Sequence, residues 1–393
     1  MIQCARQPGL AQIWEDILGF DKAEFYIKRW SHLDGMSFND VLVSFPDAIP
    51  CGIKTADDKG KIILNPDGHY VLCKGDEVLV IAEDDDSYSP TSPSKVHCGS
   101  LPQLPIPPKL PEKILFCGWR RDIHDMIKVL DAFLPRGSEL WIFCDVSIEE
   151  RERKLHEENL YQMENIKIQH RQGNPVIRRH LESLPLQTFD SILILADEKL
   201  EENIVIADSR SLATLLLIRD IQSKRIPDSY SDIAQRRRTG CIHGSWIGDM
   251  QQVSDQSIII SEILDSRTKH LVSLSKISDY VLSNELVSMA LATVAEEKQI
   301  NRVLKELFGE EGNELYIRSA EYYLYDQEEL TFFQIMLRAH QRHEIVIGYR
   351  KAYEERVIVN PPNKAVPYKW STADVFVILG NYNDSLLEKI HVQ

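Results

Sequence analysis

Long hydrophobic runs are missing from this sequence of 393 residues. The densest apolar stretch, residues 212–218, contains Thr214 and is far shorter than the roughly 20 apolar residues that a membrane-spanning helix needs. The N-terminal residues 1–8 also lack the basic and apolar segments of a secretory signal, and they read like an entry into the middle of a longer protein. We therefore expect a soluble chain that does not itself cross a bilayer.

Basic residues are few relative to acidic ones. Lys and Arg number 45 against 60 Asp and Glu, which gives a formal net charge of -15. Sequence-independent nucleic-acid binding depends on Lys and Arg placed against phosphates, so we expect no nucleic-acid partner. The negative electrostatic potential of such a chain favours divalent cations or basic partners. At about 150 residues per domain, the length predicts two or three domains.

Paired cysteines are also absent. The seven cysteines form an odd set with no Cys-x-x-Cys pair and no histidine at zinc-finger spacing. Cys117 and Cys144 fall within predicted buried strands, where a free thiol behaves as a small apolar side chain. The sequence therefore predicts a reducing compartment, with neither a structural zinc site nor a disulfide framework.

Catalytic signatures are lacking as well. The sequence has no Gly-x-Ser-x-Gly elbow, no HExxH motif, no P-loop and no kinase signature, so we expect no enzymatic activity. His340 and His343 are three residues apart on a predicted helix and could share a ligand, although a solvated helix face explains the pair better.

A repeat brackets the chain. Four short segments near the start recur in the same order near the end, with matching β-branched strands and Asn-Pro turns. The pairs are 24–28 with 314–318, 49–54 with 345–350, 62–66 with 357–361, and 76–81 with 373–378. Each copy predicts a small β-rich (α+β) lobe. Because such a lobe has a small hydrophobic core, we expect it to pack against a neighbouring lobe or domain.

The segment between the repeats differs in composition. Residues 87–111 contain seven prolines, which exclude a helix or an inner strand, so we predict a semi-rigid linker that is either a geometric tether or a tolerated loop. Strands and helices then alternate. Strands are expected at 114–117, 139–144, 166–168, 190–196 and 257–264, and helices at 122–133, 149–158, 176–184 and 209–224.

This alternation of apolar strands with helices predicts an α/β, Rossmann-like domain with a parallel sheet covered on both faces. A helical crossover should follow, with a break near Gln299. The predicted domain bounds are a first lobe at 1–86, a linker at 87–111, a Rossmann-like lobe at 112–265, a crossover at 266–308 and a second lobe at 309–393.

The first predicted strand of the parallel sheet ends where a dinucleotide fingerprint would begin. Gly118 is the only one of three required glycines, and Asp145, after the second strand, stands where an acid would bind the ribose. NAD binding at Gly118 and Asp145 is one interpretation, and a Rossmann scaffold that binds no dinucleotide is the favoured alternative.

Acidic clusters are the remaining candidate sites. Calcium takes six to eight oxygen ligands, usually from carboxylates and carbonyls, but neither cluster has EF-hand spacing. The candidate calcium carboxylates are Asp84, Asp85, Asp86, Glu310, Glu311 and Glu314. Solvated charge is the favoured interpretation of any single cluster, because runs of like charge usually face water.

The order of these segments resembles the regulator-of-conductance-for-potassium (RCK) domains of channel gating rings. Residues 3–10, 114–122 and 138–143 are, in addition, closely similar to the CASTOR and POLLUX family of plant ion channels. The resemblance covers essentially the whole chain. It implies the C-terminal lobe of a first RCK domain at 1–86 and a second RCK domain from residue 112, in a fragment that lacks the pore.

The family resemblance implies a calcium-regulated cation channel of the nuclear envelope, active in root symbiosis, in which a tetrameric gating ring couples ion binding to a transmembrane pore. Three functions stay open at this point. They are a calcium-responsive gating ring, a dinucleotide-binding sensor or NAD-dependent protein, and a purely structural assembly domain.

Overall fold

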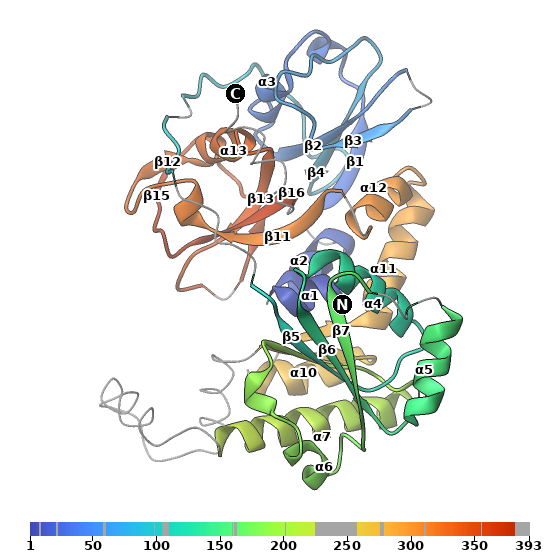
Figure 1. The fold of residues 1–393 in the computed structure, drawn as a ribbon. Coiled ribbons are helices and arrows are strands. Elements are labelled where there is room, and N and C mark those ends of the chain that lie inside the picture. The colour runs from blue at the N-terminus through green and yellow to red at the C-terminus, as the bar shows by residue number, and fades with distance from the viewer. Residues whose placement is uncertain are drawn as a thin grey trace. The chain divides into compact units, whose positions relative to one another are not determined.

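The computed structural model divides the chain into two compact units, residues 1–11 with 108–287 and residues 12–107 with 288–393 (Figure 1). It describes all residues except 8, 21, 22, 58, 59, 98, 104–109, 159, 161, 162, 201, 225–257, 276–278, 310, 311, 355 and 382–393. The division falls within helices α2 (Leu10–Leu18) and α11 (Ser283–Glu296). Among the described helices, none is both long and apolar enough to span a membrane.

A six-stranded parallel sheet forms the centre of the first unit. Its strand order is β10-β9-β8-β5-β6-β7, that of a doubly wound sheet, with the order reversing between β5 and β8. The strands are β5 (Lys113–Cys117), β6 (Ser138–Cys144), β7 (Ile166–Gln172), β8 (Ser191–Ile194), β9 (Ile258–Ile263) and β10 (Asp279–Leu282). This confirms the predicted Rossmann-like parallel sheet.

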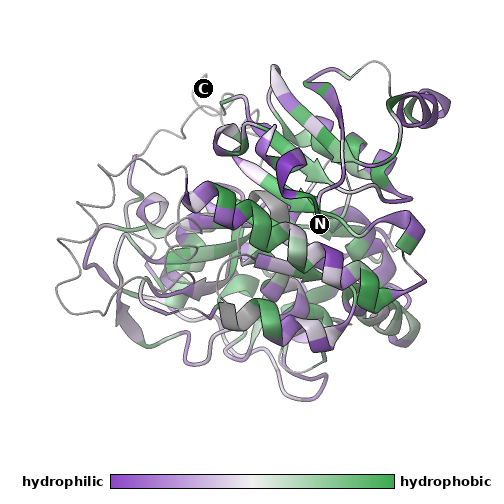
Figure 2. Ribbon diagram, turned by 90° about the horizontal axis from the view of Figure 1, so that it is seen from below, coloured by the Kyte–Doolittle hydropathy of each residue, from purple (hydrophilic) through white to green (hydrophobic). Residues whose placement is uncertain are grey.

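Helices cover both faces of this sheet. Alternate residues of β5 enter two separate apolar clusters: Phe116 packs with Ile127 of α4 on one face, and Leu115 packs with Leu215 of α7 on the other. The helices of this unit are α1 (Ile2–Arg6), α4 (Ile123–Phe133), α5 (Ile148–Glu157), α6 (Arg178–Glu182), α7 (Ile204–Ser223) and α10 (Ser266–Ser275), with short 3-10 helices at Leu186–Thr188 and Glu198–Leu200. Figure 2 shows the mixture of hydrophobic and hydrophilic residues along the helices, as expected for elements buried on one side.

One boundary differs from the sequence-based expectation. The helical crossover expected from residue 266 is interrupted by β10, which pairs with β9 and extends the parallel sheet beyond residue 265. Short apolar runs fit a buried strand as well as a helix, which explains the error. The expected break near Gln299 is confirmed, because α11 ends at Glu296 and α12 (Ile300–Leu307) begins at Ile300.

The second unit contains the two copies of the repeat. Each copy is a four-stranded antiparallel sheet, ordered β1-β4-β2-β3 in the first lobe and β11-β16-β13-β14 in the second. The strands of the first lobe are β1 (Glu24–Lys28), β2 (Ala48–Lys54), β3 (Ile62–Leu64) and β4 (Glu77–Ala82). Those of the second are β11 (Glu314–Ser319), β13 (Glu344–Arg350), β14 (Ile358–Val359) and β16 (Val375–Gly380), with β12 (Glu329–Thr331) and β15 (Pro367–Lys369) paired beside them.

The repeat extends to structural detail. The ladder shifts register between Pro50 and Gly52 in the first lobe and between Val346 and Gly348 in the second. Each lobe also has one helix between its first two sheet strands, α3 (Phe38–Leu42) and α13 (Phe332–His340), and a short 3-10 helix, Ser31–Leu33 or Ala320–Tyr322. The four ordered sequence matches therefore reflect one fold that occurs twice.

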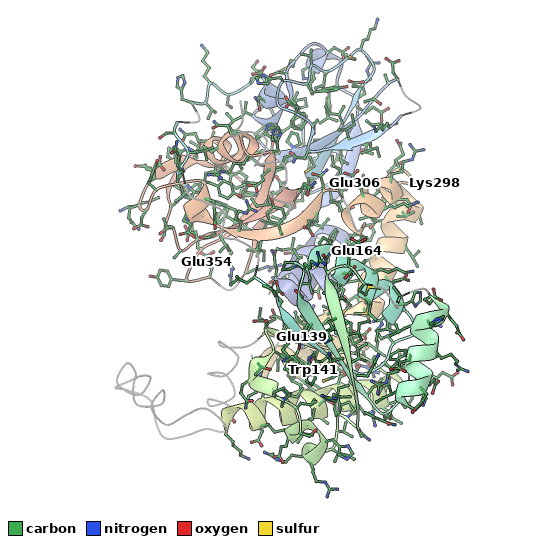
Figure 3. The ribbon with its side chains drawn as sticks, in the orientation of Figure 1. Glu139, Trp141, Glu164, Lys298, Glu306 and Glu354 are labelled. Carbon is green, nitrogen blue, oxygen red and sulfur yellow. The ribbon has the colours of Figure 1, made fainter. Side chains whose placement is uncertain are left out.

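The two lobes pack against each other within this unit. Asn65 donates its side-chain N–H to the carbonyl of His343, and Asn360 donates to the carbonyl of Asp47 at 2.9 Å. The two contacts are equivalent under the repeat, so the interface has approximate two-fold character. Asn313 adds a further link, because its amide donates to Glu306 of α12, labelled in Figure 3, and to the carbonyl of Leu64.

The linker follows the surface of both lobes. We call residues 87–103 the strap. Tyr88 is 3% exposed and packs against Trp30 and Phe45 of the first lobe, with ring centroids 6.1 and 6.3 Å away. Further along, the carbonyl of His97 accepts a hydrogen bond from Gln334 in the second lobe. In its described part the segment is thus a docked strap, and residues 104–109 of the predicted linker lie outside the described residues.

Candidate functional site

The carboxyl end of β5 is the place where a doubly wound sheet usually binds a ligand. Gly118 follows β5 with φ +118, and a Cβ atom there would lie 2.4 Å from the carbonyl oxygen of Leu195. Glycine is therefore required at this turn by the close approach of the loop after β8. The sequence analysis chose Gly118 as one glycine of a dinucleotide fingerprint, whereas the structure gives this close approach as the reason for it.

Side chains of the chain itself occupy the rest of the turn. Trp119 is 3% exposed, and its backbone N–H donates to Asp197 at 3.0 Å. Arg120 binds Asp122 at 2.6 and 3.0 Å and also pairs with the buried carboxylate of Glu262. A pyrophosphate needs free backbone N–H groups at this point, and those of Gly118 and Trp119 already donate to the Phe143 carbonyl and to Asp197.

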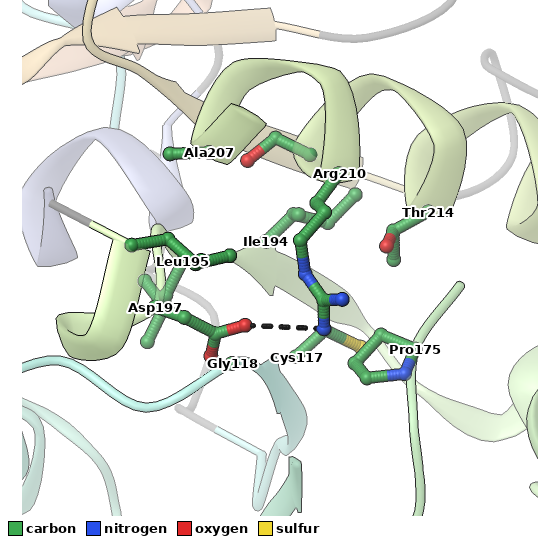
Figure 4. A pocket seen from close by; sticks show the side chains of 11 residues that line it. Cys117, Gly118, Pro175, Ile194, Leu195, Asp197, Ala207, Arg210 and Thr214 are labelled. Atoms are coloured by element: carbon green, nitrogen blue, oxygen red, sulfur yellow. Dashed lines mark hydrogen bonds and ion pairs between the residues drawn. The ribbon is translucent and has the colours of Figure 1, made fainter. Parts of the chain in front are cut away.

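The crevice beside this turn is small (Figure 4). Its cavity of about 10 Å³ holds about one water molecule, and Arg210 reaches across it to Asp197 at 3.4 Å. Burial raises the pKa of Asp197, and the Trp119 N–H and Arg210 oppose that shift. Asp145 is half-exposed and 3.9 Å from Arg210. Arg210 thus pairs with both Asp145 and Asp197. This geometry argues against NAD binding at Gly118 and Asp145.

The acidic run after β4 lies at the surface of the first lobe. Asp84, Asp85 and Asp86 are exposed, and Lys28 pairs with Asp85 at 3.3 Å. Asp84 and Glu296 both act through their charges on Glu24 of β1. The sequence analysis did not single out Glu24 or Glu296. The pKa of Glu24 is raised mainly by burial and further by the charges of Glu296 and Asp84.

The sequence indicates the position of Glu24 better than that of Glu296. Glu24 pairs with Ala82 across β1 and β4, so the antiparallel register places it near the acids that follow β4. Glu296, at the end of α11, lies more than 200 residues further along the chain, and no local pattern indicates its position. Within the described part of the chain, no group of three or more His, Cys, Asp or Glu side chains is arranged to hold a metal ion.

The acids of the second repeat behave differently. Glu314 opens β11, opposite Gly380, and is only 9% exposed. Glu310 and Glu311 lie outside the described residues. Glu314 is the counterpart of Glu24 in the repeat, so the two lobes place an acid at the same point of the first strand.

A larger cavity lies between the two lobes of the second unit. It measures about 390 Å³, and its lining comes from both lobes and from the strap. The residues that line it are Asn39, Asp40, Val43, Asp67, Gly68, His69, Ser94, Val96, Leu337, His340, Gln341 and His343. No local sequence pattern indicates this cavity, because its walls join residues about 300 positions apart.

His340 is an interface residue. It is 5% exposed, its Nδ1 lies 2.9 Å from Asn39 Oδ1, and its Nε2 lies 3.1 Å from the carbonyl oxygen of Pro66. Burial lowers the pKa of His340 to about 4. The expectation of a solvated helix face was therefore wrong for His340. His343 is exposed as expected, but it lies beyond the end of α13 with φ +55.

Comparison with known proteins identifies the relatives of this chain. The family described as "Castor and Pollux, part of voltage-gated ion channel" matches residues 1–97. The chain is 68% identical over 381 residues to the probable ion channel POLLUX of Oryza sativa subsp. japonica, covering 96% of this chain and 39% of that protein. It is 67% identical over 383 residues to the ion channel DMI1 of Medicago truncatula, covering 97% and 43%.

These matches confirm the resemblance to the CASTOR and POLLUX ion channels. The ion channel CASTOR of Lotus japonicus is a further relative, 65% identical over 382 residues, of which this chain covers 44%. The chain thus spans about two fifths of the length of these relatives. Their names are those of ion channels and not of enzymes.

The fold of the chain also occurs in a solved structure. The human SLO3 gating ring superposes with a TM-score of 0.60 at 15% sequence identity, covering 98% of this chain and 74% of that chain. At this identity the similarity concerns the fold alone. It confirms the expected RCK type of architecture, with a Rossmann-like sheet and two β-rich lobes.

Proposed function

We propose that this chain is the gating-ring portion of a cation channel and that it couples ligand binding to opening of the pore in the full-length protein. The observation that carries this proposal is the identity of 65–68% to ion channels over nearly the whole chain. A ligand that binds one arrangement of the ring more tightly than another shifts the ring toward that arrangement. The fold of a channel gating ring supports the same assignment.

We propose calcium as the ligand, with Asp84 among the carboxylates that bind it. Glu296 and Asp84 already raise the pKa of Glu24, so a cation there would relieve repulsion between like charges. Asp85, Asp86, Glu310, Glu311 and Glu314 stay candidate ligands. Because the carboxylates are not preassembled, binding would require Glu24, Asp84 and Glu296 to move closer together.

The setting of the full-length protein belongs to the same proposal. We propose that it forms a tetramer, lies in the nuclear envelope, and acts in calcium signalling during root symbiosis. The division at residue 86, between a first and a second RCK domain, is likewise proposed. Support comes from the resemblance to the CASTOR and POLLUX ion channels and from the gating-ring fold of the chain.

The test is thermal melting of the purified chain with calcium, magnesium or NAD at fixed protein concentration. A ligand at ~100 times its dissociation constant adds roughly 2.7 kcal/mol to the native state, which moves the midpoint by several degrees. We expect a shift with calcium that Asp84→Asn and Glu296→Gln reduce. The matched control is Asp57→Asn, at another exposed acid of the first lobe.

Each outcome separates two functions. A calcium shift that Asp57→Asn keeps and Asp84→Asn loses supports the gating-ring sensor at the proposed place. A shift with NAD would instead support a dinucleotide sensor and contradict the assignment. No shift with any of the three ligands would leave a structural assembly domain.

A further inference from the structure

The strap carries two serine–proline pairs. Ser89 precedes Pro90 and Ser92 precedes Pro93, and the second pair continues as Ser92-Pro93-Ser94-Lys95. Neither the fold nor the proposed calcium site uses these residues. A serine followed by proline, with a basic residue three positions on, is the substrate pattern of proline-directed protein kinases.

The structure presents both serines to solvent. Ser89 and Ser92 are exposed, whereas Tyr88, one position before Ser89, is buried. Residues 88–97 form neither helix nor strand, so the backbone around each serine is open to a kinase cleft. Tyr88 thus anchors the strap to the first lobe, while Ser89 and Ser92 stay accessible to solvent.

We propose that the strap is a phosphorylation site and that Ser92 is its main acceptor. In the reaction the Ser92 Oγ atom attacks the γ-phosphorus of ATP, an Oγ–P bond forms, and the bond to the leaving ADP breaks. The hydroxyl proton passes to the base of the kinase. Pro93 lacks a backbone N–H and keeps Ser92 in the extended conformation that such kinases bind.

The strap is attached to the C-terminal end of α3 on either side of Ser92. The N–H of Thr91 donates to the carbonyl of Ser44 at 2.7 Å, and the N–H of Ser94 donates to the carbonyl of Val43 at 3.3 Å. These carbonyls follow the last turn of α3 and carry partial negative charge. Asp40 of the same helix lines the inter-lobe cavity together with Ser94.

A phosphate on Ser92 would therefore loosen the strap. It places about two negative charges between two donors that bind helix C-terminal carbonyls, where repulsion is expected. Release of Thr91 and Ser94 removes the wall that the strap gives to the inter-lobe cavity. Phosphorylation of Ser92 would thus widen the mouth of this cavity, which is already partly open to solvent.

The experiment treats the purified chain with a proline-directed Ser/Thr kinase, ATP and Mg²⁺, and maps the phosphate by mass spectrometry. We expect incorporation on Ser92 that is lost in Ser92→Ala and in Pro93→Ala, which keeps the hydroxyl. Ser89→Ala should leave it in place. Hydrogen exchange at the amides of Thr91 and Ser94 should become about fivefold faster after phosphorylation.

Two controls make the result decisive. Exchange in β5 and β6 of the other unit should not change, and a synthetic peptide of residues 87–97 reports whether the motif itself is a substrate. Phosphorylation of the peptide but not of the native chain would overturn the proposal, and so would failure of both. Phosphate on Ser92 with unchanged exchange at Thr91 and Ser94 would overturn the release of the strap.

Discussion

At the scale of single residues, Gly118 shows how one atom of added bulk can be costly. A Cβ atom there would meet the Leu195 carbonyl oxygen at 2.4 Å, on a backbone with φ +118. We expect Gly118→Ala to lower the free energy of unfolding by about 1–3 kcal/mol more than positive φ alone explains. The measurement is the urea midpoint of the purified chain.

Gly137 provides the matched control for this substitution. It also has positive φ, +99, but the nearest atom to an added Cβ, Pro111 Cγ, is 3.7 Å away. Gly137→Ala should therefore report the backbone strain without the clash. Equal losses in the two variants would show that the approach of Leu195 to Gly118 has no energetic weight.

The second residue-scale prediction concerns pH. Burial lowers the pKa of His340 to about 4 from an ordinary value of 6.5. Between these values the unfolded chain binds a proton that the folded chain does not, so the stability contribution is complete above pH 6.5 and is lost as the pH falls toward 4. The loss should reach roughly 3 kcal/mol.

The variant His340→Gln tests this assignment. We expect a smaller change of unfolding free energy between pH 6.5 and 4.5 than in the parent chain, measured by urea denaturation at several pH values. His156→Gln, at an exposed position of α5, serves as the control. An unchanged pH slope in His340→Gln would mean that another group is responsible.

At the scale of elements, the turns after β3 and β14 connect the two lobes. Asn65 and Asn360 both have positive φ, 46 and 48, and each donates to a backbone carbonyl of the other lobe. Substitution by glycine keeps the backbone conformation and removes only the side chain. We expect Asn65→Gly and Asn360→Gly each to cost about 1 kcal/mol.

Thermal melting can detect this loss, because about 1 kcal/mol moves the midpoint by about 2–4 °C for a unit of this size. The control is Asn363→Gly, which has φ 56 and an exposed side chain. A drop as large in Asn363→Gly as in Asn360→Gly would show that the inter-lobe hydrogen bond contributes nothing.

The elements also show what sequence can and cannot predict. The repeated strands were predicted because alternating β-branched residues and Asn-Pro turns are local signals. β10 was missed because Tyr280, Val281 and Leu282 are an apolar run directly before a helix. The docking of Tyr88 on Phe45 and the contact of His340 with Asn39 were not predictable, because each depends on packing between distant segments.

The candidate sites divide in the same way. Asp84 was chosen from a run of acids, whereas Glu296, whose charge also acts on Glu24, comes from another element and became visible only in three dimensions. Gly118 was chosen from the sequence as a fingerprint glycine. The contacts of Trp119 with Asp197 and of Arg120 with Glu262, which fill the turn after it, are not encoded in the spacing of residues.

At the scale of the whole molecule, net charge should control assembly. Each copy carries a formal charge of -15, so copies that approach in a ring repel one another. Salt screens this repulsion, since the Debye length falls from about 30 Å at 0.01 M to about 8 Å at 0.15 M. We expect self-association, measured by sedimentation velocity, to strengthen as sodium chloride is added.

If the acids near Asp84 bind calcium, calcium should promote self-association more strongly than its screening of charge repulsion alone explains. At matched ionic strength, calcium should raise the assembled fraction above the level reached with sodium or magnesium, because a bound ion neutralises charge at a fixed place. Asp84→Asn should remove this excess and keep the dependence on sodium chloride. Equal effects of calcium and magnesium in the parent chain would mean that the ions only screen charge, and the ligand of the ring would then have to be sought elsewhere, first at the inter-lobe cavity.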